Sequence, residues 1–282
     1  MGIILGIDIG GSTTKICGFH ENGTLIEPLS VKADDPVSSI YGAFGKFTSL
    51  HGILLSQVER VMVTGAGSSY ISDDLYGIPT EHVREFDCIG LGGQYLAGLS
   101  EAIVVSMGTG TAIVHARADG TMKYLGGTGV GGGTLVGLSK LLLNAESIGH
   151  IEKYAEGGSL DNIDLRIKDM TASNSLNQLE GDLTAANFGK LSDIASKDDI
   201  ALGIMNLVFE TVGMVSIFAA RSVGVKDIIL TGNVTRLAHC RRKFDEFNHL
   251  EVGRGLNFVI PERSRFSTAI GAAMIGMRWG EK

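Results

Sequence analysis

Residues 3–15 read Ile-Ile-Leu-Gly-Ile-Asp-Ile-Gly-Gly-Ser-Thr-Thr-Lys, an apolar run that ends in two glycines and three hydroxyl residues. A second apolar run follows at residues 16–19, so the segment predicts a β-hairpin with a tight glycine turn. Glycines allow a phosphate to approach the backbone, and the N–H groups and hydroxyls of the turn can donate to it. Asp8 would lie beside that phosphate and could hold a hydrated Mg²⁺, while Lys15 adds positive charge. An ordinary glycine-rich hairpin with a surface aspartate explains the segment equally well.

The same pattern returns later in the chain. Residues 102–107 form another apolar run, followed by Gly-Thr-Gly-Thr at 108–111 and by a further apolar run at 112–115. Short strands that end in Thr-Gly also occur twice, at residues 60–65 and 227–232. Matches in the same order predict a duplicated α/β domain with a nucleotide held between its halves.

This arrangement resembles the superfamily of acetate and sugar kinases, Hsp70 and actin over essentially the whole chain. The resemblance implies two ribonuclease-H-like (actin-like ATPase) domains with the nucleotide cleft between them. We predict an N-terminal domain at residues 1–99 and a C-terminal domain at residues 100–282, with a helical insertion near residues 149–200.

Composition narrows the classes of function. The chain has 282 residues, of which 44% are hydrophobic, so it can build two cores. Its net charge of −7 argues against a nucleic-acid partner. The three cysteines show no C-x-x-C spacing, which speaks against zinc and iron–sulfur sites and favours a reducing, cytoplasmic location. No signal peptide is expected, and Asn206 and Glu210 inside the apolar stretch 201–220 favour a buried or interfacial helix over a membrane span.

Several segments together resemble the type II (eukaryotic-like) pantothenate kinases of bacteria, over residues 3–277. They are Asp8-Ile9-Gly10-Gly11, Glu85-Phe86-Asp87, Gly108-Thr109-Gly110-Thr111, Gly126-Gly127 with Gly131-Gly132-Gly133, and residues 181–189. The resemblance implies transfer of the γ-phosphoryl group of ATP to the primary hydroxyl of pantothenate, the first step of coenzyme A biosynthesis. It implies ATP and Mg²⁺ as cofactors, feedback by coenzyme A or its esters, and no nucleic-acid or membrane partner.

The resemblance also assigns roles to residues. Glu85 is the expected catalytic base, because a hydroxyl that attacks phosphorus needs a carboxylate within hydrogen-bond reach. The expected ATP contacts are Asp8 (which also holds Mg²⁺ through water), Gly10, Gly11, Ser12, Thr13, Thr14, Lys15, Thr109, Gly132, Gly133, Thr134, Leu135, Val136 and Asn233. The expected acceptor contacts are Glu85, Tyr124, Gly126, Gly127 and Asn187.

Plainer explanations exist for most of these residues. Glu85 could be a polar residue at a strand end, Thr109 a turn residue, and Asn233 the N-cap of a helix. Residues 181–189 could be a loop that joins two helices. The glycine run 131–133 is harder to explain without a ligand, since glycines there cost chain entropy.

Tyr124 departs from the family, which usually has Arg two residues before the Gly-Gly pair. Tyr lacks the charge and the bidentate fork of Arg, although Lys123 could supply part of that charge. Three functions therefore stay open: an active pantothenate kinase, a kinase of the same fold for another small hydroxylated substrate, and a catalytically weak homologue that binds nucleotide or coenzyme A esters.

Family members dimerise through their long helices, so the apolar helix at residues 201–220 predicts a homodimer, with a purely internal core helix as the alternative.

Overall fold

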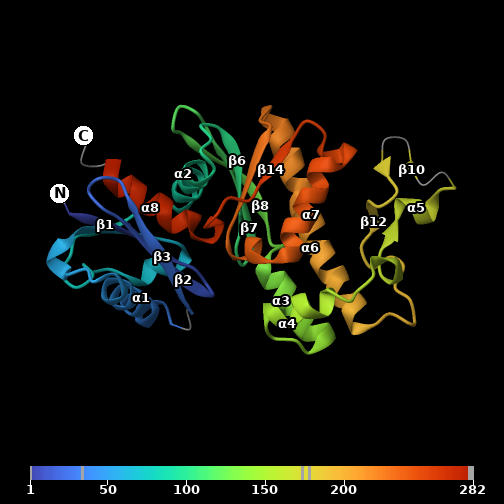
Figure 1. Cartoon of the computed structure of the whole chain (residues 1–282), viewed down its shortest axis with the longest axis horizontal. Coiled ribbons are helices and arrows are strands. Elements are labelled where there is room, and N and C mark those ends of the chain that lie inside the picture. Colours follow the sequence, from blue (N-terminus) through green and yellow to red (C-terminus); the bar gives the residue numbers. More distant parts are fainter. Residues whose placement is uncertain (1, 33–34, 173–174, 177–178, 279–282) are drawn as a thin grey trace.

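The computed structural model describes residues 2–32, 35–172, 175–176 and 179–278 (Figure 1). The N-terminal half contains a five-stranded sheet in the order β3-β2-β1-β4-β5. Its strands are β1 (Ile3–Ile9), β2 (Thr13–Phe19), β3 (Leu25–Lys32), β4 (Val58–Thr64) and β5 (Thr80–His82). β1, β2 and β3 form an antiparallel meander, while β4 and β5 join β1 in parallel.

A second five-stranded sheet repeats this topology in the order β8-β7-β6-β13-β14. Its strands are β6 (Ala102–Met107), β7 (Thr111–Ala116), β8 (Met122–Thr128), β13 (Asp227–Thr231) and β14 (Asn257–Val259). Here too a meander is followed by two parallel strands. The predicted duplicated α/β fold is therefore confirmed.

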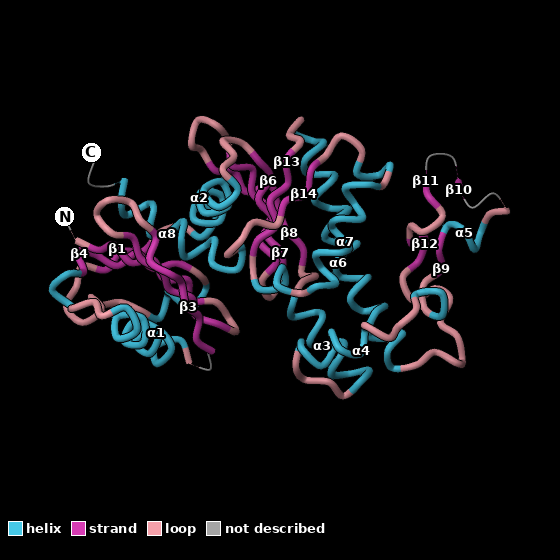
Figure 2. Tube along the Cα trace, in the orientation of Figure 1, coloured by secondary structure: helices cyan, strands magenta, loops and turns pink. Residues whose placement is uncertain are grey.

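Helices separate and cover the two sheets (Figure 2). α1 (Pro36–His51) packs on β2 and β3, whereas α2 (Glu85–Ala97) and α8 (Ser267–Arg278) pack against each other between the sheets. This middle layer is thin because glycines line it: a Cβ on Gly6 would collide with the carbonyl of Ala269, and one on Gly92 with that of Ser267. α8 thus packs on the first sheet although it follows the second sheet in sequence. The predicted boundary after residue 99 stays a prediction.

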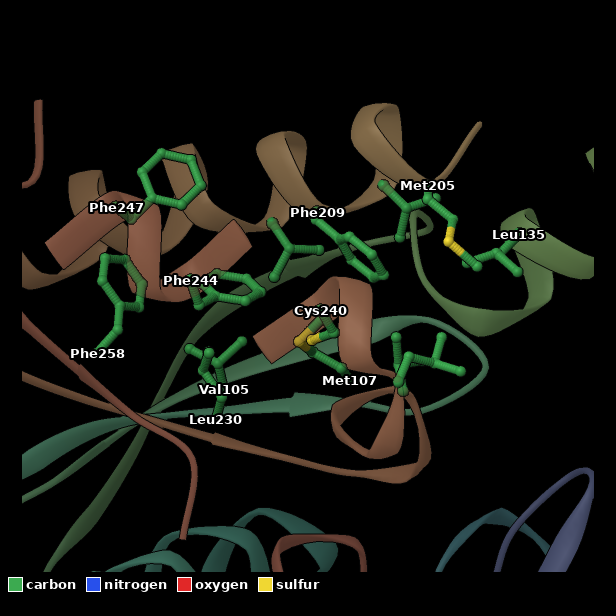
Figure 3. Packing of buried hydrophobic residues seen from close by; sticks show 14 of the residues in the cluster. Val105, Met107, Leu135, Met205, Phe209, Leu230, Cys240, Phe244, Phe247 and Phe258 are labelled. Carbon is green, nitrogen blue, oxygen red and sulfur yellow. The ribbon is translucent and has the colours of Figure 1, made fainter. Parts of the chain in front are cut away.

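The outer face of the second sheet carries the remaining long helices: α3 (Gly132–Leu143), α4 (Ile148–Ala155), α6 (Lys197–Val223) and α7 (Ala238–His249). α6 begins earlier than predicted because Ser196 and Asp199 form a capping box. Figure 3 shows the core that α6 and α7 close with β6 and β13. In the described part of the chain α6 is long and apolar enough to cross a membrane, but 61% of its most apolar window is buried within the fold, as in a core helix.

Short elements complete the chain. Single 3₁₀ turns lie at Leu55–Gln57, Ala66–Tyr70, Leu160–Asn162, Asn233–Arg236, Glu251–Gly253 and Ser264–Phe266. The turn at Ala66–Tyr70 follows directly after β4 and Gly65. Extended Leu237 separates the turn at Asn233–Arg236 from α7.

The described residues between 156 and 195 form an arm beyond α6 and α7 (Figure 1). It contains β9 (Leu165–Arg166), α5 (Ile167–Met170), β10 (Ser175–Leu176), β11 (Leu179–Glu180) and β12 (Thr184–Ala186). Asp164 is fully buried and ties the arm to α6, because its carboxylate accepts hydrogen bonds from the Phe188 N–H and from Asn206 Nδ2, both at 2.8 Å. The arm is therefore anchored at its base and extends away from the two sheets.

Candidate active site

Both hairpin turns line one cavity of about 320 Å³ between the halves. That volume lies at the lower end of ordinary ligand sites, which span about 300–1,000 Å³. Many of the predicted residues line it: Asp8, Gly10, Gly11, Ser12, Thr13, Lys15, Glu85, Thr109 and Asn233. Further lining residues come from segments to which the sequence pointed less directly: Ala66, Ile89, Ser106, Gly108, Gly110, Thr111, Ala112, Thr128, Gly232 and Thr268.

Asp8 and Lys15 form a buried ion pair on the first-half wall of the cavity. They are directly opposite on β1 and β2, and Lys15 Nζ lies 2.9 Å from Asp8 Oδ2. The side chains are 7% and 10% exposed, so water screens the pair weakly. Gly65, with φ +87°, leaves room for the other carboxylate oxygen, since a Cβ there would lie 2.7 Å from Asp8 Oδ1. The strand-Thr-Gly motif thus shapes the space around Asp8.

The second half carries an uncharged counterpart of this pair. Thr64 is paired with Asp8 on the first sheet, and Thr231 is paired with Ser106 at the equivalent place on the second. Ser106 in turn faces Ala112 as Asp8 faces Lys15. Asp8, Lys15, Ser106 and Ala112 all line the cavity. The first hairpin therefore places an ion pair in the cavity where the second hairpin places uncharged residues. Extending the sequence repeat through the hairpins would have identified Ser106.

Glu85 is the first residue of α2 and lines the cavity, although the sequence placed it at the end of a strand. The strand ends earlier, at His82, and Arg84 is the N-cap of the helix. Burial raises the pKa of the Glu85 carboxyl, the charge of Asp8 raises it further, and Lys15 opposes both. A carboxylate with a raised pKa is a better proton acceptor, which suits a general base.

Thr14 does not line the cavity, because side chains alternate along β2. Thr13 and Lys15 face the cavity, whereas Thr14 is fully buried on the other face and its Oγ1 has no hydrogen-bond partner within the described residues. The side chain of Thr14 therefore has no route to a nucleotide in this arrangement.

The start of α3 packs onto the second hairpin turn instead of opening to the cavity. The N–H groups of Gly132 and Gly133 donate to the carbonyls of Gly108 and Thr109 at 2.9 and 2.8 Å. A Cβ on Gly131 would lie 2.8 Å from Thr109 O. Close backbone packing thus explains this glycine run without any ligand, so the run by itself does not indicate one.

The rest of the predicted segment 132–136 is also turned away from the cavity. Thr134 Oγ1 donates to the carbonyl of Gly129 and accepts from the N–H of Gly131, which satisfies its hydroxyl locally. Leu135 is fully buried in the core beside Met205 (Figure 3), and Val136 does not line the cavity. Since none of these residues lines the cavity, their expected nucleotide contacts stay predictions.

Asn233 joins the two halves across the cavity. Its Nδ2 donates to Thr13 Oγ1 at 2.9 Å, over a sequence separation of 220 residues. The N-cap of its 3₁₀ turn is Gly232, whose φ is +94°, so the N-cap explanation of Asn233 is wrong.

Tyr124, Gly126 and Gly127 belong to β8. The Tyr124 ring stacks on Phe86, with centroids 4.1 Å apart. Gly127 is required by close packing, because a Cβ there would collide with the carbonyl oxygen of Thr111. Gly126 has φ +137°, so any other residue at this position would have a strained backbone. None of the three lines the cavity, although Thr128 at the end of the same strand does.

Asn187 lies in the arm, directly after β12, and the structure does not bring it to the cavity. Figure 1 shows the arm at the opposite end of the molecule from β1 and β2. Its neighbours Asp182 and Leu183 line a separate cavity of about 660 Å³ between the arm, α6 and α7. Residues 181–189 therefore do not form a wall of the cleft within one copy of the chain.

The donor set suits a magnesium ion carried in with a nucleotide. Among the described residues, no group of three or more His, Cys, Asp or Glu side chains gathers as a metal site. Mg²⁺ keeps several waters and takes one or two carboxylates together with substrate phosphates, and Asp8 can supply such a carboxylate. The three cysteines are buried and free.

Comparisons with known proteins identify relatives of this chain. The family model described as Fumble matches residues 99–244. The chain is 30% identical to a type II pantothenate kinase of Oceanobacillus iheyensis over 81% of this chain and 83% of that relative. It is 28% identical to a type II pantothenate kinase of Staphylococcus aureus over 96% of this chain and 99% of that relative.

Solved structures with the same fold include two different kinds of protein. Component A of the (R)-2-hydroxyglutaryl-CoA dehydratase of Acidaminococcus fermentans matches with a TM-score of 0.70 and 19% identity, over 100% of each chain. A ROK family glucokinase of Streptomyces griseus, in complex with glucose and AMPPNP, matches with a TM-score of 0.59 and 15% identity, over 97% of this chain and 99% of that one. At these identities the likeness shows the fold alone.

Proposed function

The chain belongs to the Fumble family and to the type II pantothenate kinases, and we propose that it uses ATP to phosphorylate the primary hydroxyl of pantothenate, the first step of coenzyme A biosynthesis. Curated relatives that are named type II pantothenate kinase match this chain over most of their length. The fold is that of nucleotide-binding kinases, and the cavity lies where its two halves meet.

One observation supports the chemistry most directly: Asp8, Lys15 and Glu85 meet in a cavity lined by two glycine turns. The turns provide backbone N–H groups for phosphate oxygens. The ion pair places a cation and a carboxylate next to each other, and Glu85 adds a carboxylate whose raised pKa suits proton transfer.

The proposed reaction uses these groups in a single displacement. Glu85 accepts the proton of the acceptor hydroxyl as its oxygen forms a bond to the γ-phosphorus, and the bond from that phosphorus to the β-phosphate oxygen breaks to release ADP. Lys15 supplies positive charge near the transferred group. Bound Mg²⁺, held through water by Asp8, would neutralise charge on the β- and γ-phosphates.

A substrate panel tests this proposal. Purified protein is supplied with Mg–ATP and, in turn, pantothenate, a hexose, and a pantothenate analogue that lacks the primary hydroxyl, and ADP release is followed. We expect ADP release with pantothenate and only background release with the other two compounds. Release with the hexose alone would instead establish a kinase of the same fold with another acceptor, the alternative that Tyr124 favours.

We propose in addition that two copies associate through α6. Most of the small and apolar residues on this helix are used internally; for example, a Cβ on Gly213 would meet the ring of Phe247. A narrower stripe remains on the outside, formed by Leu207, Met214 and Phe218, which share one helical face, and Phe218 is 59% exposed. A second copy of the chain would cover this stripe in a homodimer.

The remaining parts of the proposal concern location and control. Three buried, free cysteines suit the reducing cytoplasm, where ATP is available. Feedback by coenzyme A or its esters belongs to the proposal through the family alone. Adding acetyl-coenzyme A to the assay tests it, and an unchanged rate at millimolar concentration contradicts it.

A further inference from the structure

The two strands that end in Thr-Gly use their threonines differently. Thr64 is the last residue of β4, is buried, and donates from its Oγ1 to the carbonyl of Val83 at 2.9 Å. Val83 lies just after β5 and two residues before Glu85, with which α2 begins. The Thr64 hydroxyl therefore joins the end of β4 to the short junction that carries the proposed base.

This hydrogen bond takes the place of a backbone bond at the end of the sheet. β4 and β5 are parallel, and the Val83 N–H donates to the carbonyl of Val63 at 2.9 Å. The next donor in such a ladder would be the N–H of Gly65, but Gly65 has φ +87° and turns the chain away into a 3₁₀ turn. Within the described backbone Gly65 makes no bond to Val83. The Thr64 side chain thus supplies the last donor between β4 and the junction.

The junction matters because the Glu85 carboxylate has no hydrogen-bond partner among the described residues. Its position in the cavity therefore depends on the backbone that carries it. Thr64 also reaches α2 beyond Glu85: burial raises the pKa of the Cys88 thiol to about 12, and a side-chain hydrogen bond with Thr64 opposes that rise. One buried hydroxyl thus contacts the chain both before and after the proposed base.

The second half shows the same motif without a base. Thr231 ends β13 at the equivalent place and is fully buried, but its Oγ1 donates to the carbonyl of Val105 on β6, at 3.3 Å, within its own sheet. The segment after β14 is held by the N–H of Gly232, which donates to the carbonyl of Ser264 at 3.1 Å. α8 follows that segment and has no acidic residue in its first turn, whereas α2 begins with one. The threonine hydroxyl therefore holds the following helix only where that helix begins with a carboxylate.

We propose that Thr64 is a positioning residue for Glu85, and that its hydrogen bond to the Val83 carbonyl keeps the carboxylate within reach of the acceptor hydroxyl. This inference rests on the proposed function and adds to it a residue that touches neither substrate. Thr64 does not line the cavity, so it acts through Glu85. A displacement of about 1 Å in a reacting group can cost about 10²-fold in rate, so loss of this contact lowers kcat.

The test compares Thr64→Val with the matched control Thr231→Val, because each change keeps the shape of the side chain and removes one buried hydroxyl. With pantothenate and Mg–ATP we expect Thr64→Val to lower kcat by about 10–100-fold and to leave KM for Mg–ATP within about threefold. Thr231→Val should keep kcat within about threefold of the wild type. Thr64→Ser restores the donor and should recover kcat to within about threefold. The unfolding temperature of each variant shows whether it is folded.

A double-mutant cycle with Glu85→Gln distinguishes positioning from a general structural effect. If Thr64 acts through Glu85, Thr64→Val should change the residual kcat of Glu85→Gln by no more than about threefold. If Thr64 acted through Asp8 instead, Thr64→Val would raise KM for Mg–ATP and would lower kcat equally in both backgrounds.

Two results with an active wild type would overturn the inference alone. One is an equal loss of kcat in folded Thr64→Val and Thr231→Val, and the other is an equal loss from Thr64→Val with and without Glu85→Gln. Thr64→Ala, judged in the same way, replaces Thr64→Val if the valine variant does not fold. A wild type that binds Mg–ATP but turns over no acceptor would overturn the proposed function itself, and the inference with it.

Discussion

The protonation state of Glu85 controls the proposed reaction, so its raised pKa predicts a pH profile. The base must be a carboxylate, and its pKa lies above the ordinary value of 4.5 because of burial and the charge of Asp8. We expect kcat at saturating Mg–ATP to rise with pH through a midpoint above that value. The residual activity of Glu85→Gln should lack this acid limb. A wild-type midpoint at or below 4.5 would contradict the assignment.

The same shift predicts how Glu85 affects stability. Since the folded protein holds the proton more tightly than the unfolded chain, stability falls as pH rises between the unfolded and folded pKa values. Glu85→Gln removes this cost, so at pH 7 its free energy of unfolding should equal or exceed that of the wild type, by no more than about 0.5 kcal/mol because the side chain is partly exposed. Urea denaturation measures this, and a loss above about 1 kcal/mol would give Glu85 a structural role.

Sequence reasoning identified the residues of the first hairpin but not all of their directions. Asp8 and Lys15 were predictable because they flank a glycine turn, and they do face the cavity. Thr14 was mispredicted because one-residue alternation within β2 matters more than membership of the motif. Thr268 had no sequence signal, since only the packing of α8 between the sheets brings it to the cavity.

At the scale of elements, the contact between α3 and the second hairpin turn shows how a glycine run can have a structural origin. The helix begins against the turn 108–110, with backbone atoms on both sides. A ligand loop and a close backbone contact both favour glycine, so composition alone could not distinguish them. The strands and long helices were more predictable, because their apolar runs are long and bounded by turns.

A pair of substitutions within α3 tests this explanation. Gly132→Ala places a methyl group 2.9 Å from Gly108 O, so we expect a loss of about 1–3 kcal/mol in the free energy of unfolding. Gly137→Ala in the same helix has no heavy atom within 4 Å of the added carbon and should gain up to about 1 kcal/mol from helix propensity. Urea denaturation of both proteins measures the difference. Equal effects would show that the α3–turn contact is looser than described.

At the scale of the whole molecule, the hydrogen bond from Asn233 to Thr13 links the two halves at the cavity. Asn233→Ala removes this link and a cavity-lining amide, so we expect ATP affinity to fall by about 2–10-fold, as for one net hydrogen bond. Asn257→Ala is the control, since Asn257 pairs with Asp227 at an exposed site away from the cavity. The ATP-induced rise in unfolding temperature measures both. An equal rise in both variants would mean that Asn233 does not contribute to nucleotide binding.

The proposed homodimer is also a property of the whole molecule. Phe218→Glu introduces a charge into the exposed stripe of α6, and we expect the protein to become monomeric at low micromolar concentration. Leu50→Glu changes an exposed apolar residue of α1 in the other half and should leave the oligomeric state unchanged. Light scattering distinguishes the two states. A wild type of about 30 kDa, the mass of one chain, would refute the dimer.

The duplicated fold was predictable as a whole because the repeat recurs in both hairpins and both Thr-Gly ends. The position of the arm was not predictable, because it depends on buried contacts such as that of Asp164 with Asn206. These contacts separate residues 181–189 from the cleft, although the family pattern associates both with the acceptor.

The central claim is that Glu85, in the cavity between the halves, activates the primary hydroxyl of pantothenate for attack on ATP. Phosphorus NMR of the products tests it most directly, with the wild type and Glu85→Gln each incubated with pantothenate and Mg–ATP. The account predicts that the wild type forms one phosphate monoester on the primary hydroxyl for each ADP, and that Glu85→Gln forms it at least about 10²-fold more slowly while still binding ATP. ADP without the ester, or an undiminished rate in Glu85→Gln, would contradict it.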